Sequence, residues 1–367
     1  MLSLTNEFED ESFGGAGTAV TGIVHMLDRR GVQETVIVPR SDWNVPSWIL
    51  RGQQIKVLGI PRNSHYFGYL GMIKADVICK EFPEICQGWD VIHCHAINFT
   101  PLAYTLSQGV IPIVYSVYSF LRKELGDRPE PDLQAQFKIQ EELLMRCQRI
   151  QLISQSERQY LASRFPDYLP KTKVIPLGIT IPSERWIQGN TNQFLYVGRL
   201  LDYKGIEDLI RAVSIRHQSG RRIHLNVVGK GTDSYEGFLK QLVQSLQLEA
   251  YVHFQGRVSS SEVWRWMARS TALVIPSLRE AYGLVALEGM AIGTPVIASN
   301  AGGLAEVVPN TCAITFEAGN VAQLSEALAS ILDNPLLQKS LSIKGCQNAL
   351  RFEWSKLAPN YLALLES

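Results

Sequence analysis

Short runs of consecutive hydrophobic residues alternate along the chain with longer runs in which hydrophobic residues recur every three to four positions. The first pattern is typical of buried strands and the second of amphipathic helices. In the first half, the strands expected from this pattern lie at residues 1–6, 34–39, 55–60, 90–95, 111–117, 150–154 and 173–178, and helices at 17–31 and 132–149. In the second half, strands are expected at 194–199, 223–229, 252–256, 272–277 and 295–299, with helices at 205–218, 235–247, 261–270 and from about 284.

A polar stretch without an apolar period, residues 183–193, separates the two series and is typical of a linker. Alternating strands and helices favour parallel, doubly wound sheets with right-handed crossovers. We therefore expect an α/β protein with two similar halves, residues 1–182 and 193–350, followed by a last segment, 351–367. Two such halves facing each other would enclose a cleft. A single large α/β domain is the alternative.

Composition narrows the function classes. The chain has 367 residues, which favours two domains, and its 35 basic and 35 acidic residues give no net charge. Bulk binding to nucleic acid or to an anionic membrane is therefore not indicated. No hydrophobic run reaches the length of a membrane span, and the acidic N-terminus lacks a signal-peptide charge pattern. The six cysteines show no zinc spacing, and we expect reduced thiols in a cytoplasmic protein.

Glycine-rich turns after two expected strands are candidate phosphate sites, because glycine lets backbone N–H groups approach a phosphate. The turn at 13–20 contains Gly15 and Gly17 but has Val20 where a dinucleotide fingerprint needs a third glycine, and the turn at 227–234 has Ser234 there. A P-loop is absent from the sequence. These failures weaken the dinucleotide and NTPase interpretations.

Two further segments carry charged residues at expected strand ends. In "VGRLLDYKG", Arg199 and Lys204 follow a strand and suit a diphosphate, although two solvated cations would give the same pattern. In "LREAYGLVALEG", Glu280 precedes a helix start and Glu288 lies just over one turn inside it. The first could accept hydrogen bonds from ligand hydroxyls and the second could bind a vicinal diol such as ribose. The structural explanation for Glu280 is that an acid near a helix N-terminus is favoured by the helix dipole. The structural explanation for Glu288 is a position on a solvated helix face.

Other catalytic motifs are absent from the sequence. His93 and His95 lie on one face of an expected strand end, where a structural role is favoured over a metal pair because no third ligand is evident. The chain has no Asp-x-Asp pair for a metal-bound diphosphate, no Gly-x-Ser-x-Gly elbow and no His-Glu-x-x-His motif. We therefore expect no metal and no cofactor.

Residues 276–308, "PSLREAYGLVALEGMAIGTPVIASNAGGLAEVV", resemble the signature of the family 4 retaining glycosyltransferases, including its Glu-x7-Glu spacing. "YVGRLLDYKGIEDLIRA" is similar to that family's donor-phosphate motif. "FGGAGTAVTGIVHML", "DVIHCH", "LISQSERQYL", "KVIPLGI" and "LNVVGKG" are similar to its other blocks in order and spacing. The resemblance covers nearly the whole chain. It implies the GT-B fold, in which two Rossmann-like domains face a central cleft, with residues 351–367 forming a helix that crosses back to the first domain.

The resemblance also implies roles for individual residues. Arg199 and Lys204 would neutralise the donor diphosphate, and Glu280 would contact the donor sugar near the reacting carbon. Glu288 would hold the ribose. The other residues implied in donor binding are Gly15, Gly17, Gly198, Gly229, Gly256, Arg257, Val258, Tyr282, Gly283, Leu284 and Val285. The reaction would be a metal-independent, configuration-retaining hexosyl transfer from a nucleotide diphosphate sugar, with a UDP-sugar as the expected donor, to a hydroxyl of an acceptor bound by the first domain.

One position departs from the family pattern. Where the family has a histidine directed at the transferred sugar, this chain has Tyr118, which leaves Tyr118 and His95 as candidate contacts to the donor sugar or acceptor. Thr180 is a second, smaller departure at a position that is usually acidic. The alternatives are a non-catalytic nucleotide-sugar-binding protein, or a GT-B epimerase or phosphorylase. The expected partners are a nucleotide sugar and an acceptor hydroxyl, without nucleic acid and without a transmembrane segment, and peripheral membrane contact stays an alternative. The chain is expected to be a monomer or homodimer.

Overall fold

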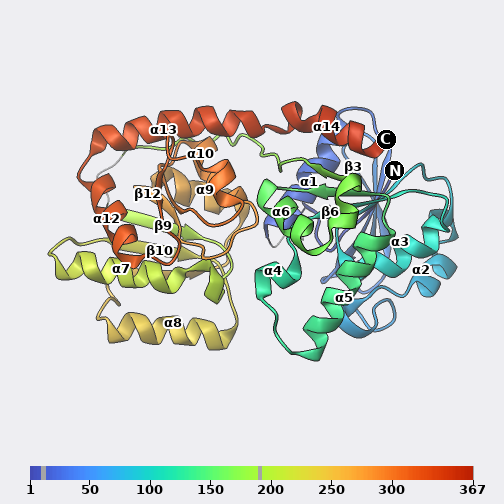
Figure 1. The fold of residues 1–367 in the computed structure, drawn as a ribbon, viewed down its shortest axis with the longest axis horizontal. Coiled ribbons are helices and arrows are strands. Elements are labelled where there is room, and N and C mark those ends of the chain that lie inside the picture. The colour runs from blue at the N-terminus through green and yellow to red at the C-terminus, as the bar shows by residue number, and fades with distance from the viewer. Residues whose placement is uncertain (10–13, 189–191, 367) are drawn as a thin grey trace. The chain divides into compact units, whose positions relative to one another are not determined.

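The computed structural model describes residues 1–9, 14–188 and 192–366, which form two compact units (Figure 1). Unit 1 comprises Met1–Gly178 and Trp354–Ser367, and unit 2 comprises Ile179–Glu353. The expected ends at 182 and 350 lie within a few residues of the observed ones, whereas unit 2 begins at Ile179 and includes the stretch expected as a linker before residue 193. Phe13 of the first glycine turn and residues 189–191 of the expected linker lie outside the described part of the chain. Within that linker, the Trp186 amide donates to the Ile292 carbonyl, so this stretch packs on unit 2.

Unit 1 is built on an eight-stranded sheet with the strand order β3-β4-β2-β1-β5-β6-β7-β8. Neighbouring strands are parallel except for β3, which pairs antiparallel with β4 at the sheet edge. The strands are β1 (Leu2–Leu4), β2 (Glu34–Arg40), β3 (Ser47–Arg51), β4 (Ile55–Pro61), β5 (Ile92–Cys94), β6 (Ile113–Val117), β7 (Arg149–Leu152) and β8 (Thr172–Val174).

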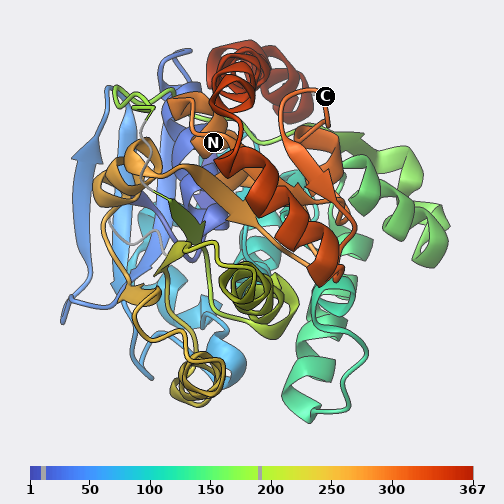
Figure 2. The ribbon, with the colours of Figure 1, turned by 90° about the vertical axis from the view of Figure 1, so that its left-hand side faces the viewer.

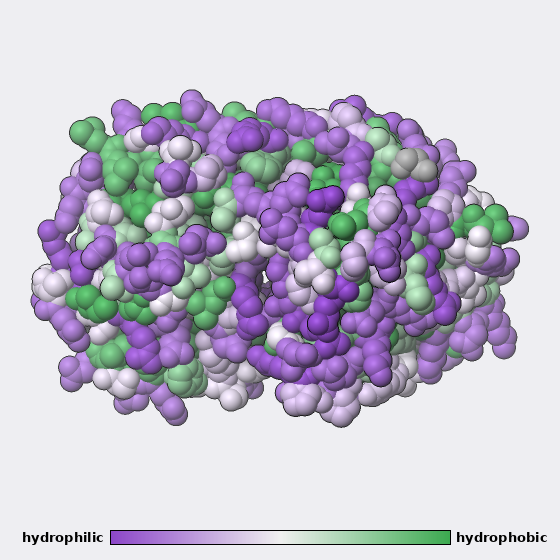
Figure 3. Space-filling model, in the orientation of Figure 1, coloured by the Kyte–Doolittle hydropathy of each residue, from purple (hydrophilic) through white to green (hydrophobic). Residues whose placement is uncertain are grey.

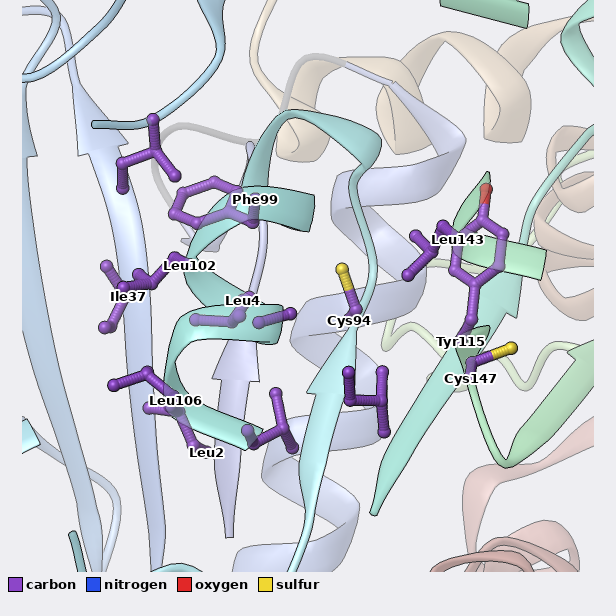
Figure 4. Close-up of a cluster of buried hydrophobic side chains, with 14 of the residues drawn as sticks. Leu2, Leu4, Ile37, Cys94, Phe99, Leu102, Leu106, Tyr115, Leu143 and Cys147 are labelled. Carbon is purple, nitrogen blue, oxygen red and sulfur yellow. The ribbon is translucent and has the colours of Figure 1, made fainter. Parts of the chain in front are cut away.

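The helices of unit 1 bury both faces of this sheet. They are α1 (Gly15–Asp28), α2 (Ala75–Glu81), α3 (Thr100–Ser107), α4 (Leu121–Leu125), α5 (Pro131–Arg146), α6 (Gln155–Arg164) and α14 (Trp354–Glu366), with short 3-10 turns η2 (Tyr69–Gly71), η3 (Pro83–Cys86), η4 (Ile97–Phe99) and η5 (Pro166–Lys171). Figure 4 shows part of the core on one face, where Leu4 of β1 and Ile37 of β2 lie beside Phe99 and Leu102. Alternate strand residues such as Val36 pack on the other face, against α1.

The last helix, α14, completes the core of unit 1 beside α1. Tyr361 is fully buried there with Ile23, and its hydroxyl contacts the Gln151 amide at 2.8 Å. The Trp354 ring lies so close to Gly22 of α1 that a Cβ on this glycine would come within 2.2 Å of ring carbon Cε2. The chain therefore needs a residue without a side chain at position 22.

Unit 2 is built on a six-stranded parallel sheet with the order β11-β10-β9-β12-β13-β14. Its strands are β9 (Gln193–Val197), β10 (His224–Val228), β11 (Val252–Gly256), β12 (Ala272–Ile275), β13 (Val296–Ser299) and β14 (Ile314–Phe316). Its helices are α7 (Ile206–Gln218), α8 (Asp233–Ser245), α9 (Ser260–Arg269), α10 (Leu284–Ile292), α11 (Leu304–Val307), α12 (Val321–Leu332) and α13 (Pro335–Ala349), with 3-10 turns η6 (Asp202–Lys204) and η7 (Leu350–Phe352). Helices α7 and α8 lie side by side in both ribbon views (Figures 1 and 2).

The surface carries hydrophobic residues in small groups among a majority of hydrophilic ones on the face shown in Figure 3. Among the described residues, no helix is both long enough and hydrophobic enough to cross a membrane.

The α/β prediction with two parallel sheets is confirmed. Each strand expected from the sequence is present within a few residues, but the sequence analysis missed several elements. They are the edge strand β3, the last strand β14, and helices α2, α3, α4, α6, α11, α12 and α13.

Candidate functional site

The carboxyl edge of the unit 2 sheet is lined by glycines. Three adjacent strands, β9, β10 and β11, reach it at Gly198, Gly229 and Gly256, and the Gly229 amide donates to the Gly256 carbonyl at 2.8 Å. A Cβ on Gly229 would come within 1.8 Å of the Gly198 carbonyl oxygen, so only glycine fits there. Because these strand ends carry no side chains, the backbone at this edge is open to a ligand.

Lys204 and Glu280, two residues that the family resemblance implies in donor binding, meet beside this edge. Lys204 ends η6, and its Nζ lies 2.9 Å from Glu280 Oε2. Both side chains are mostly buried, with 17% and 16% exposed. The Ser277 hydroxyl donates to the same carboxylate oxygen at 3.2 Å. Glu280 is therefore fixed by protein contacts through Oε2, while Oε1 has no hydrogen-bond partner within the described residues.

Three cations contact Tyr203, one at its hydroxyl and two at its ring. The Arg199 guanidinium donates to the Tyr203 hydroxyl at 3.3 Å, and Lys204 Nζ lies 5.4 Å from the ring centroid. Arg279 Cζ lies 5.3 Å from the same centroid, a residue that the sequence analysis did not select. The only signal for Arg279 in the sequence was its position directly before the candidate residue Glu280. Arranged around one tyrosine, the three cations form a positive region suited to an anion.

Helix α10 begins at the same sheet edge. Its N-cap is Gly283, with a positive φ of 106°, and a Cβ there would come within 2.4 Å of Leu304 Cδ1. No side chain caps the helix and its first turn carries no acid. The amides of Leu284 and Val285, in the first turn, have no carbonyl of their own helix to bind. Tyr282, directly before this N-cap, is buried, with 3% of its surface exposed. The helix therefore presents N–H donors suited to a phosphate.

Glu288 lies one turn after Leu284 on α10. Its side chain is half-buried, and burial raises the pKa of its carboxyl to about 7. No hydrogen-bond partner of this carboxylate is found within the part of the chain described. A carboxylate in apolar surroundings without a protein partner suits a ligand that donates hydrogen bonds. Arg257, exposed, and Val258 follow β11 at the edge of the sheet.

The first glycine turn leads into α1 in unit 1. The helix begins at Gly15 with Gly14 as N-cap, and Gly17 is buried in its first turn. No side chain caps this end, and the first turn has no acidic residue. Within the described residues, this helix start therefore also presents N–H donors suited to an anion.

The unusual Tyr118 is held by His95. Its hydroxyl lies 2.8 Å from His95 Nδ1, and burial lowers the pKa of this imidazole well below its usual range. His93 contacts the Ser116 hydroxyl at 2.7 Å, and its pKa is lowered to about 3 by burial. Both rings are thus neutral near neutral pH. No group of three metal-ligating side chains occurs among the described residues, so the two histidines have no third ligand there.

Two protein-family models match this chain. Residues 180–347 match the model described as "Glycosyl transferases group 1", and residues 13–181 match "Glycosyltransferase Family 4". Together the two models span nearly the whole chain.

Individual relatives are more distant. A D-inositol 3-phosphate glycosyltransferase of Kineococcus radiotolerans is 24% identical over 94% of this chain and 88% of its own. A glycogen synthase of Mycobacterium tuberculosis is 29% identical over 78% of this chain and 71% of its own.

Solved structures show the same fold at low identity. Sucrose-phosphate synthase from Thermosynechococcus elongatus has a TM-score of 0.81 and 21% identity, covering 100% of this chain and 98% of that one. The Anabaena protein HepE, solved with UDP-glucose, has a TM-score of 0.77 and 19% identity, with coverage of 100% and 98%.

Proposed function

The chain belongs to the family 4 glycosyltransferases, has the GT-B fold and is a hexosyltransferase-type enzyme that uses a nucleotide sugar, and from this we propose its reaction in detail. The enzyme transfers a hexosyl group from a nucleotide diphosphate sugar to an acceptor hydroxyl, with retention of anomeric configuration and without a metal ion. We propose UDP as the nucleotide, since HepE is described in complex with UDP-glucose. The proposed place of action is the cytoplasm, and the proposed state is a monomer or homodimer.

The observation that carries this proposal is the arrangement around Lys204. Its ammonium is fixed at Glu280, which lies three residues before the uncapped start of α10, and both Lys204 and Arg199 contact Tyr203. When the sugar leaves, negative charge builds on the diphosphate. Fixed cations and helix-terminal N–H groups stabilise this charge more strongly in the transition state than in the ground state. The same groups supply positive charge where a metal ion would otherwise be needed.

The sugar and the nucleoside contact the two acids. Glu280, through Oε1, accepts hydrogen bonds from the sugar hydroxyls, and Glu288 accepts the two ribose hydroxyls. Gly256, Arg257 and Val258 line the base. Among the described residues, no pair of carboxylates is assigned to the roles of a retaining glycosidase. The acceptor therefore attacks from the face that the diphosphate leaves, and a diphosphate oxygen takes its proton. The acceptor is bound by unit 1.

Donor turnover in EDTA tests the proposal. Release of the nucleotide is measured over UDP-, GDP- and ADP-linked hexoses and N-acetylhexosamines, without and with a broad acceptor panel. We expect one donor to release its nucleoside diphosphate slowly in EDTA, and faster with an acceptor. A strict requirement for Mn²⁺ would contradict the metal-independent mechanism, and a product with inverted configuration would contradict retention.

The second candidate is a non-catalytic nucleotide-sugar-binding protein. It is favoured by one observation, the replacement of the family's sugar-directed histidine by Tyr118, whose hydroxyl is already engaged by His95. Tight donor binding without nucleotide release over the whole acceptor panel would support it against the transferase.

A further inference from the structure

Strand β3 leaves one edge of the unit 1 sheet without a paired strand. It pairs antiparallel with β4 on one side, from Ser47 opposite Gly59 to Arg51 opposite Ile55. Among the described residues, no strand pairs with its other side, because β3 is the first strand in the order of the sheet. The N–H and C=O groups on the outer side of an edge strand are a template for pairing with another chain. The outer side of β3 therefore offers hydrogen-bonding groups to one further strand.

The side chains of β3 add hydrophobic surface to this open edge. Trp48 and Leu50 have 42% and 74% of their surfaces exposed. Ile49, between them, packs on the core beside α1, so Trp48 and Leu50 lie on the opposite face of the sheet. The only charged residue of β3, Arg51, is paired with Glu9 at 2.8 Å. Edge strands are commonly protected from pairing by free charges or by proline, and β3 contains neither.

A groove of about 380 Å³ lies along this exposed face of β3. Its lining residues are Trp48, Ile49 and Leu50 of β3, Lys56 of β4 and Glu84 of η3. The groove thus combines hydrophobic side chains with one positive and one negative charge. A twofold dimer brings a surface onto a copy of itself. Because the two charges of the groove balance, two copies of this surface can meet without net repulsion.

We propose that β3 pairs with β3 of a second copy of this chain, antiparallel and centred on Ile49, in a homodimer. In this register Trp48 lies opposite Leu50 of the partner subunit, and the same pair recurs across the twofold axis. The exposed tryptophan and leucine are thereby covered, and the outer N–H and C=O groups of β3 gain partners. The inference goes beyond the proposed reaction and does not depend on it.

The choice of a second copy follows from symmetry. Two identical strands that pair antiparallel about their central residue satisfy a twofold axis, so β3 alone supplies both sides of the contact. Its alternation of Trp48, Ile49 and Leu50 places hydrophobic residues opposite hydrophobic residues in that arrangement. No further segment and no complementary charge on another protein is needed.

Sedimentation velocity over a concentration series tests the dimer with the full chain. The variants are Leu50→Lys and a control, Val110→Lys, which replaces an 85% exposed hydrophobic residue of unit 1 outside β3. We expect the wild type and the control to reach twice the mass of one chain. Leu50→Lys should dimerise at least about tenfold more weakly, because its charged group would lose water at the contact. Thermal unfolding checks that this variant folds, as expected for an exposed position.

Two double variants test the register itself. Trp48→Lys/Leu50→Lys and Trp48→Lys/Leu50→Glu lose the same hydrophobic residues, but the first places like charges opposite each other across the axis and the second opposite charges. We expect the second to dimerise at least about tenfold more tightly than the first, because directly opposite strand residues interact. Equal behaviour of the two, including absence of dimers in both, would overturn the register centred on Ile49.

A wild type that stays monomeric at every concentration would overturn the proposal. A wild-type dimer that Leu50→Lys leaves unchanged would do the same, because its contact would lie elsewhere. Binding of the monomer to vesicles of phosphatidylcholine and phosphatidylglycerol, lost in Leu50→Lys, would assign this surface to a membrane instead. Donor hydrolysis in EDTA is recorded in the same preparations. Its absence would count against the proposed reaction, while the measured masses would still report on β3.

Discussion

Lys204 combines a structural and a proposed catalytic role, which measurements of stability and of kcat can distinguish. It neutralises Glu280 in the free protein, and in the proposed reaction it stabilises the leaving diphosphate. Because the pair is mostly shielded from water, the lysine is held in place before the donor arrives. The cost of ordering its side chain is thus met in folding, not in catalysis.

Lys204→Met is expected to lower kcat for sugar transfer by about 10²–10³. The matched control is Lys240→Met, at an exposed position on α8, which should leave kcat unchanged. Rates are measured with saturating donor, and thermal unfolding is recorded in parallel. A variant that unfolds at lower temperature but retains its kcat would show that the Lys204–Glu280 pair is structural only.

Glu288 predicts a pH dependence of donor binding. Burial raises the pKa of its carboxyl to about 7, so the acid is largely protonated at pH 6 and ionised at pH 8. Only the ionised form accepts two ribose hydroxyls without offering a proton of its own. We expect the affinity for UDP-glucose, measured by calorimetry, to rise between pH 6 and 8. Glu288→Gln should bind more weakly at pH 8 and show little change with pH, and an equal rise in this variant would assign the effect to another group.

The raised pKa of Glu288 has the opposite effect on folding stability, which falls as the pH rises. Because the folded-state pKa exceeds the usual 4.5, the protonated folded form is favoured, and stability is lost as pH rises from about 4.5 to about 7. Glu34, fully buried in unit 1, also has a pKa raised to about 7 and contributes a loss of its own. The difference in unfolding free energy between the wild type and Glu288→Gln isolates the contribution of Glu288.

At the scale of elements, the contact between α1 and α14 depends on the absence of one side chain. A Cβ on Gly22 would overlap the Trp354 ring, whereas a Cβ on Gly237, inside α8, would meet no atom within 4 Å. Gly22→Ala should destabilise unit 1 by about 1–3 kcal/mol through overpacking. Gly237→Ala, the matched control, should stabilise its helix by up to about 1 kcal/mol because alanine favours a helix. Urea unfolding of the two variants checks both signs, and equal effects would mean that α14 shifts to accommodate the added methyl group.

Elements with a strong local pattern could be predicted from the sequence. The hydrophobic run before Gly198 predicted β9 correctly, and the glycine before Leu284 predicted the start of α10. Both features are local, because a buried strand and a helix start each leave a signal in neighbouring residues. The edge strand β3 was missed. Its five residues follow Pro46 and include exposed Trp48 and Leu50, so it lacks the continuous hydrophobic run of a central strand.

Contacts between distant strands could not be predicted in the same way. Lys204 reaches Glu280 across 76 positions, and the family resemblance, not spacing, brought the two together. His95 and Tyr118 meet because β5 pairs with β6. A single sequence does not encode strand order in its local pattern, so the engaged Tyr118 hydroxyl became evident only in the fold.

For the molecule as a whole, each unit has its own core, which allows the two to differ in stability. All the groups proposed to bind the nucleotide, except the glycines of α1, belong to unit 2. UDP at 100 times its dissociation constant should stabilise the state that binds it by about 2.7 kcal/mol. The effect should therefore be concentrated in unit 2 and should not require a metal.

Hydrogen exchange with and without UDP, in EDTA, measures this directly. We expect slower exchange at residues 198–205, 229–231, 256–258 and 280–288, where the proposed phosphate, base and ribose contacts lie, and little change in β2, β3 and β4 of unit 1. Protection by UDP that appears only when Mn²⁺ is added would contradict a diphosphate site built from Arg199, Lys204 and the start of α10.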